Sequence, residues 1–183
     1  VELSAKPFES TYEPLPSVNV LIKNANIYDG EGNEFQETDV LIQDRKIIAI
    51  GKDLPASDDF EVIDASGKWV TPGIIDIHSH MGVYPAPGVK TSSDGNEATS
   101  PVTADVWAEH SMWVQDPQYT LALSGGVTAF HVLPGSANLI GGRGVTVKNL
   151  QRNTINSMKF PDAPHSLKMA CGENPKRVYG NRQ

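Results

Sequence analysis

Short apolar runs rich in β-branched residues alternate with turn residues through the first third of the chain. Runs of this length, bounded by Gly, Asp and Ser, predict strands joined by hairpins, with Asp44-Arg45 and Ser66-Gly67 near the turns. The runs are VNVLIKNANIYDG (18–30), TDVLIQDRKIIAIG (38–51) and FEVIDASGKWVTPG (60–73). The pattern predicts a small β-rich unit over residues 18–70.

The pattern changes after Pro72-Gly73. The run IIDIHSH (74–80) is typical of a strand that a parallel sheet buries on both faces, and GVTAFHVLPG (126–135) is a second such strand. Two later strands are expected in GVTVKNL (144–150) and SLKMACGE (166–173), and PAPGVKTSSDGNEATSPV (85–102) has the composition of a long loop. Strands that alternate with helices or long loops indicate parallel βα units, whose sites lie at the carboxyl ends of the strands.

Two helices are expected between these strands. Thr103 can cap a helix that runs to about Val114, with His110 on its apolar face as a packed core or interface residue. Asp116-Pro117 is a start signal for a second helix, which Gly125-Gly126 would end. Residues 1–17 contain three prolines and no apolar period, so they predict an extended arm that lies on another surface or stays mobile. The predicted organisation is therefore an arm (1–17), a β unit (18–70) and an α/β unit (71–183).

Composition narrows the classes of protein. The chain is 39% hydrophobic and 20% charged, which is ordinary for a globular domain, and it lacks the ~20-residue apolar run of a membrane span. A formal net charge of −7 disfavours nucleic acid or an anionic membrane as a partner. Cys171 is the single cysteine, so no internal disulfide can form, and the compartment stays open.

Candidate chemistry gathers at the end of the run 74–80. Alternate side chains of a strand share a face, so Asp76, His78 and His80 are expected to point the same way. Two imidazoles at a strand end can converge on one ion, and neutral imidazole is the commonest ligand for zinc. His78 and His80 are therefore candidate metal ligands, and Asp76 could orient one of the rings.

The stretch VTPGIIDIHSH resembles the first barrel strand of the amidohydrolase superfamily, in particular its imidazolonepropionase-like and metal-dependent dipeptidase-like branch. LIKNANIYDG, VLIQDRKIIAIG and VIDASGKWVTPG are similar to the N-terminal β-sandwich part of that family. The resemblance implies an α/β fold, with a small N-terminal β-sandwich domain followed by the first half of a (β/α)8 TIM-type barrel. It also implies one or two divalent ions, zinc before others, and attack by a metal-bound hydroxide on an amide, cyclic amide or peptide C–N bond.

The same resemblance assigns candidate residues. His78 and His80 match the first-strand ligands, and the fourth strand should add an anionic ligand, either a carboxylated lysine at Lys168 or the carboxylate of Glu173. We favour Glu173, because it lies at the expected strand end and needs no modification. Arg143, in a loop at the catalytic face, could pair with a substrate carboxylate. His131 could contact substrate from the second strand, with structural packing as the alternative.

Length limits the enzyme hypothesis. A (β/α)8 barrel needs ~250 residues, and about 110 follow Gly73, enough for about four βα units. Later histidines and an aspartate implied by the family have no candidates here, so we expect an N-terminal fragment, inactive alone, that works with the remaining C-terminal part of the same enzyme. Open sheet edges favour a homo-oligomer. The alternative is a non-catalytic assembly or binding module that retains the barrel strands.

Overall fold

The computed structural model describes residues 8–180, which cluster into two compact units. One unit spans Pro14–Pro72, and the other contains residues 8–13 and the chain from Gly73 onward. Residues 1–7 of the predicted arm lie outside the described residues. Within the described part of the chain, no helix is long and apolar enough to cross a membrane.

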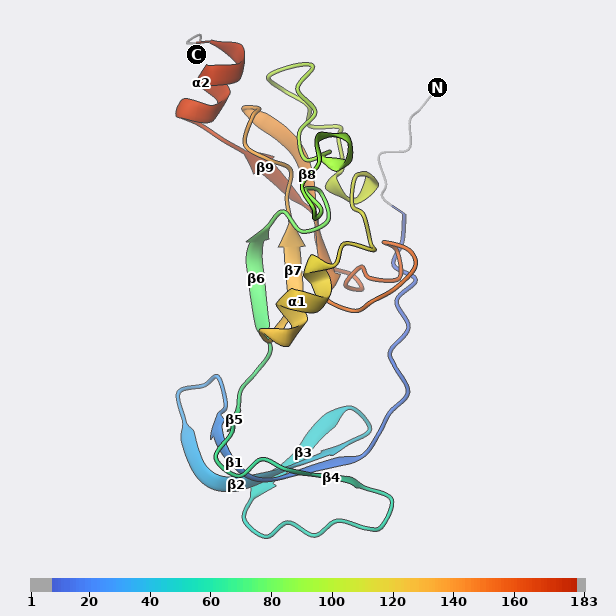
Figure 1. Cartoon of the computed structure of the whole chain (residues 1–183), viewed down its shortest axis with the longest axis vertical. Helices are drawn as coiled ribbons and strands as arrows, with labels where there is room; N and C mark the ends of the chain where they lie inside the picture. The colour runs from blue at the N-terminus through green and yellow to red at the C-terminus, as the bar shows by residue number, and fades with distance from the viewer. Residues whose placement is uncertain (1–7, 181–183) are drawn as a thin grey trace. The chain divides into compact units, whose positions relative to one another are not determined.

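The first unit is a single mixed sheet with the order β3-β2-β1-β4, and β5 also pairs with β1 (Figure 1). Its strands are β1 (Val20–Tyr28), β2 (Glu34–Gln43), β3 (Lys46–Gly51), β4 (Glu61–Asp64) and β5 (Trp69–Val70). Strands β2 and β3 form the predicted antiparallel hairpin, and Asp44 and Arg45 at its turn both have positive φ. The predicted hairpin at Ser66-Gly67 is wrong, because β4 and β5 both run parallel to β1. The chain on both sides of this turn therefore pairs with β1, first through β4 and then, farther along β1, through β5.

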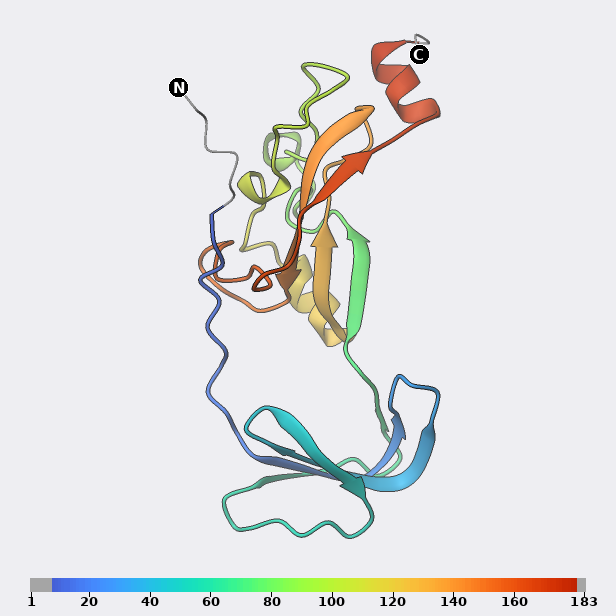
Figure 2. The ribbon, with the colours of Figure 1, turned by 180° about the vertical axis from the view of Figure 1, so that it is seen from behind.

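The second unit contains a four-stranded sheet in the order β6-β7-β8-β9. Its strands are β6 (Ile74–Ser79), β7 (Val127–Val132), β8 (Ile140–Lys148) and β9 (Ser166–Met169). Strands β6 and β7 are parallel as predicted and lie side by side in Figures 1 and 2. Strand β8 is antiparallel to both β7 and β9, which corrects the expectation of parallel βα units throughout. Strand β9 consequently runs in the same direction as β6 and β7.

The helical segments of this unit are short. They are η1 (Lys90–Ser92), η2 (Ala108–His110), α1 (Gln118–Ser124) and α2 (Glu173–Tyr179). Helix α1 begins after Asp116-Pro117 and ends at Gly125, as predicted. The predicted helix from Thr103 is wrong: Thr103 N donates to Ile140 O, and Arg143 N donates to Val106 O. These bonds hold the segment in an extended form along β8, and the exposed His110 is not a core residue.

The core of the second unit lies between α1 and one face of the sheet. Its buried residues include Phe130 and Val132 of β7, Val145 and Val147 of β8, and Tyr119 of α1. Strand β6 is not buried on both faces as predicted, because Ile75 and Ile77 are 62% and 77% exposed. Among the described strands, β6 pairs with β7 alone, so it lies at the edge of the sheet. The core thus fixes one face and leaves the other open.

Candidate metal centre

The two predicted histidines lie close together at the carboxyl end of β6. The ring centroids of His78 and His80 are 5.5 Å apart, and the rings are almost perpendicular. His78 is the penultimate residue of the strand, and His80 follows its final residue, Ser79. In α/β proteins, ligands bind beyond the carboxyl ends of the strands, where these two histidines lie. Two imidazoles are therefore available to one ligand.

His80 has a defined tautomer. Its Nδ1 lies 2.9 Å from Leu133 O, and a carbonyl can only accept, so the proton resides on Nδ1. This leaves the lone pair of Nε2 free of that bond. A histidine that ligates a metal usually donates its other N–H to a carbonyl or carboxylate in this way. Leu133 directly follows β7, so the neighbouring parallel strand orients the ring.

Lys168 of β9 lies against His78. Its Nζ is 3.3 Å from His78 Nε2, and Lys168 is only 9% exposed. An ammonium group has donors alone, so the lysine donates to the ring nitrogen. Burial lowers the pKa of Lys168, because desolvation disfavours the charged amine. The Lys168 amine thus lies at His78 Nε2, the ring nitrogen through which that imidazole could bind a ligand.

Glu173, the favoured fourth-strand residue, does not join the histidines. Strand β9 ends at Met169, and Glu173 is the exposed first residue of helix α2. Within residues 8–180, no cluster of three or more His, Cys, Asp or Glu side chains could hold a metal ion. The preference for Glu173 rested on its place at the expected strand end, and the strand ends four residues earlier, at Met169. The geometry favours Lys168, the alternative.

Arg143 and His131 are both held by other groups. Arg143 Nε donates to Ala104 O, and its guanidinium lies 4.6 Å from the Trp107 ring centroid. In the β8–β9 register Arg143 is opposite Leu167, one residue out of phase with Lys168, so it points to the other face of this ribbon. Figure 2 shows the two strands from behind. The structure does not bring Arg143 to the histidines, and its predicted contact with substrate stays a prediction.

His131 connects three strands. Its Nδ1 is 2.9 Å from Thr146 Oγ1 of β8, and its Nε2 is 2.6 Å from Ser166 Oγ of β9. Burial lowers the pKa of His131, and the nearby rings of His165 and His78 lower it further. With both nitrogens bonded to hydroxyls, the ring fits the structural alternative better than contact with substrate. It ties β9 to the sheet two residues before Lys168.

The donor set fits a nitrogen-binding divalent ion. It offers Nε2 of His80, Nε2 of His78 and a lysine amine with a lowered pKa. Sequence reasoning missed the contact between Lys168 and His78, because the antiparallel strand β8 decides which residues of β9 face β6. The pairing of Lys168 with Gly142 is the relevant register. A Cβ at Gly142 would collide with the backbone of Val106, and its φ of +117° also favours glycine.

Comparisons with known proteins place the chain in a family. No family model matches it. It is 36% identical over 88% of its length to the amidohydrolase tasK of Hapsidospora irregularis, and 46% identical over 44% of its length to a dihydroorotase of Lactobacillus leichmannii. The chain spans 19% and 18% of the lengths of those two relatives.

A solved structure agrees with the sequence relatives. An amidohydrolase from Thermotoga maritima MSB8 matches 88% of this chain with 42% identity and a TM-score of 0.78, and the chain spans 41% of that protein. The likeness confirms the predicted α/β fold class, with a half-barrel sheet in the second unit, whereas the described strands of the predicted β-sandwich domain form one mixed sheet. With the histidine pair at the end of β6, these similarities show that the chain belongs to the amidohydrolase superfamily, as a sequence of its N-terminal part.

Proposed function

We propose that the chain carries the first metal ligands of a hydrolase that cleaves C–N bonds in a small amide, cyclic amide or peptide. The observation that carries the proposal is the grouping of His78, His80 and Lys168 at the open end of the sheet. The names of the relatives, an amidohydrolase and a dihydroorotase, support the type of bond. The activity and substrate of the whole protein remain part of the proposal.

In this proposal His78 and His80 bind through Nε2, and Lys168 takes the place that we first assigned to Glu173. A lysine becomes an anionic oxygen ligand when its neutral amine forms an N–C bond with carbon dioxide and loses one proton. The lowered pKa of Lys168 supports this step, because only the neutral amine has a lone pair to give.

Zinc is the ion that we expect, in one or two copies, because imidazole nitrogens and an anionic oxygen are among its usual ligands. When bound, such an ion lowers the pKa of water and polarises a carbonyl. The residues described here would hold and orient the site: Leu133 O fixes His80, and His131 fixes β9. In the proposal, residues from the C-terminal part of the enzyme complete the site.

Metal content tests the proposal. We expect the chain, incubated with zinc and freed of excess, to retain at least one ion. His78→Ala, His80→Ala and Lys168→Ala should each lower the affinity by at least about tenfold, measured by competition with a chelator. His110→Ala is the matched control, since its side chain is 59% exposed and it should change nothing. Equal zinc retention in all four variants would contradict the proposed ligands.

A further inference from the structure

The loop that follows His80 is held by two side chains at the start of helix α1, from Asp116, two residues before the helix, and from Gln118, its first residue. Asp116 Oδ2 accepts from Gly82 N at 3.3 Å, and Asp116 Oδ1 accepts from Ala86 N at 3.2 Å. Gln118 Nε2 donates to Tyr84 O at 3.2 Å. The side chains of Asp116 and Gln118 therefore bond the backbone of Gly82, Tyr84 and Ala86. These hydrogen bonds are made to the main chain of the loop, so they hold it in place independently of its side chains.

The carboxylate of Asp116 is the centre of this arrangement. Asp116 is 3% exposed, and it also accepts from the N–H and from the side-chain amide of Gln118, at 3.0 and 3.1 Å. All four contacts are donors to its oxygens, so the buried charge is satisfied by hydrogen bonds instead of a cation. An anion with four directed donors is a strong constraint on the positions of those donors.

The loop in turn contacts a candidate ligand. The ring of Tyr84 packs edge-on against His80, with centroids 5.6 Å apart. Asn96 Nδ2 donates to the Tyr84 hydroxyl, which fixes the far end of the ring. His80 is thus held on one side by Leu133 O and on another by Tyr84. The bond to Leu133 fixes the tautomer, whereas the Tyr84 contact limits rotation of the imidazole.

We propose that Asp116 is a positioning residue for His80, acting through the backbone of residues 82–86 and the ring of Tyr84. The inference rests on the proposed function, because it concerns the orientation of His80 Nε2 toward a metal ion. Asp116 is remote from the ion in this account and contacts neither ion nor substrate. Its effect is to hold the Tyr84 ring in contact with the imidazole of His80.

Asp116→Asn is the informative change, because it keeps the shape and replaces one acceptor by a donor. In either orientation the new NH₂ faces a loop N–H, at Gly82 or at Ala86, so one contact becomes repulsive. We expect zinc affinity to fall by about tenfold or more, as when groups that orient a ligating histidine are lost. In a Tyr84→Leu background the same change should have little further effect, because the ring that transmits it is absent.

A second readout needs no metal. In the metal-free chain, imidazole ¹H–¹⁵N spectra should show a His80 ring with its proton on Nδ1, and Asp116→Asn should broaden or shift this signal. The His131 signals should stay unchanged. Asp39→Asn is the matched control: Asp39 is 2% exposed and its carboxylate accepts from Asn24 N and Leu54 N in the other unit. It should cost stability and leave zinc affinity and the His80 signal intact.

The outcomes separate the two proposals. If the unmodified chain binds no zinc, the proposed function fails, and the His80 spectrum still decides the role of Asp116. If zinc binds and Asp116→Asn changes neither the affinity beyond about twofold nor the His80 signal, the positioning role is overturned. Equal losses of zinc affinity in Asp116→Asn and Asp39→Asn would also overturn it, because general destabilisation would then explain both.

Discussion

At the scale of single residues, the site depends on which ring nitrogens and amines already make hydrogen bonds within the protein. His80 could be predicted from its place at the end of an apolar strand, but the partner of its Nδ1 could not, because Leu133 is far away in sequence. Lys168 and Glu173 were both candidates, and the choice between them depended on where β9 ends. The strand ends at Met169, four residues before Glu173. Chain pairing, which the sequence does not display, brings Lys168 and not Glu173 into contact with His78.

The pKa of His131 leads to a prediction about acid stability. Burial and two neighbouring rings lower this pKa below 6.5, so the unfolded chain binds the proton more readily than the folded one. Stability from the neutral ring is complete above about pH 6.5 and is lost as the pH falls through the lowered value. His131→Gln should therefore flatten the decline in urea midpoint on going from about pH 7.5 to about pH 5. An unchanged decline in His131→Gln, equal to that of the control His110→Gln, would refute this.

At the scale of elements, apolar periodicity located the strands and the Asp-Pro and Gly-Gly signals located α1. The helix expected after Thr103 does not form, because backbone pairing of this segment with β8 outweighs its local preference. Similarly, β8 has the composition of a buried strand, and nothing in that composition says that it runs antiparallel to β7. Local pattern therefore predicts where strands lie, and long-range pairing sets their direction and their neighbours.

Gly82 shows how tightly one element fits another. It has a φ of +78°, and a Cβ there would collide with the hydroxyl of Tyr119, a buried residue of α1. Gly82→Ala should cost about 1–2 kcal/mol for the backbone alone and more for the collision. Gly88→Ala is the control, with a φ of +76° and open space around it, so it pays the backbone cost only. Unfolding in urea measures both, and equal losses would show that the packing on α1 is unimportant.

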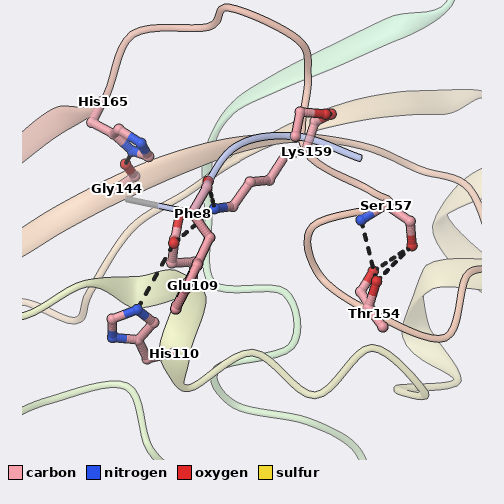
Figure 3. Close-up of polar contacts among 9 residues, drawn as sticks. Phe8, Glu109, His110, Gly144, Thr154, Ser157, Lys159 and His165 are labelled. Carbon is pink, nitrogen blue, oxygen red and sulfur yellow. Dashed lines mark hydrogen bonds and ion pairs between the residues drawn. The ribbon is translucent and has the colours of Figure 1, made fainter. Parts of the chain in front are cut away.

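At the scale of the whole molecule, an ion pair anchors the described start of the chain to the second unit. Lys159 Nζ lies 2.7 Å from Glu109 Oε1 and donates to Phe8 O, as Figure 3 shows. The side chains of Lys159 and Glu109 are 5% and 1% exposed. Thr11 N adds a bond to Asn156 O. Residues 8–13 therefore lie on this unit, which agrees with one of the two alternatives predicted for the arm, an extended segment on another surface.

Breaking that pair should be costly. Lys159→Met leaves the Glu109 carboxylate buried without its cation, which we expect to destabilise the fold by about 3–5 kcal/mol. It should also speed hydrogen exchange at Thr11 N. Glu109→Gln combined with Lys159→Met should recover most of the stability, and the exposed Lys176→Met should have no effect. A single variant as stable as the original would show that the pair contributes little.

We propose that His78, His80 and Lys168 surround one divalent ion. Anomalous diffraction at the zinc edge, from crystals grown with zinc, tests it most directly. We expect a peak within bonding distance of Nε2 of both histidines, with extra density for a carboxyl group on Lys168. A peak elsewhere, with the Lys168 amine still against His78 in zinc-saturated crystals, would contradict it.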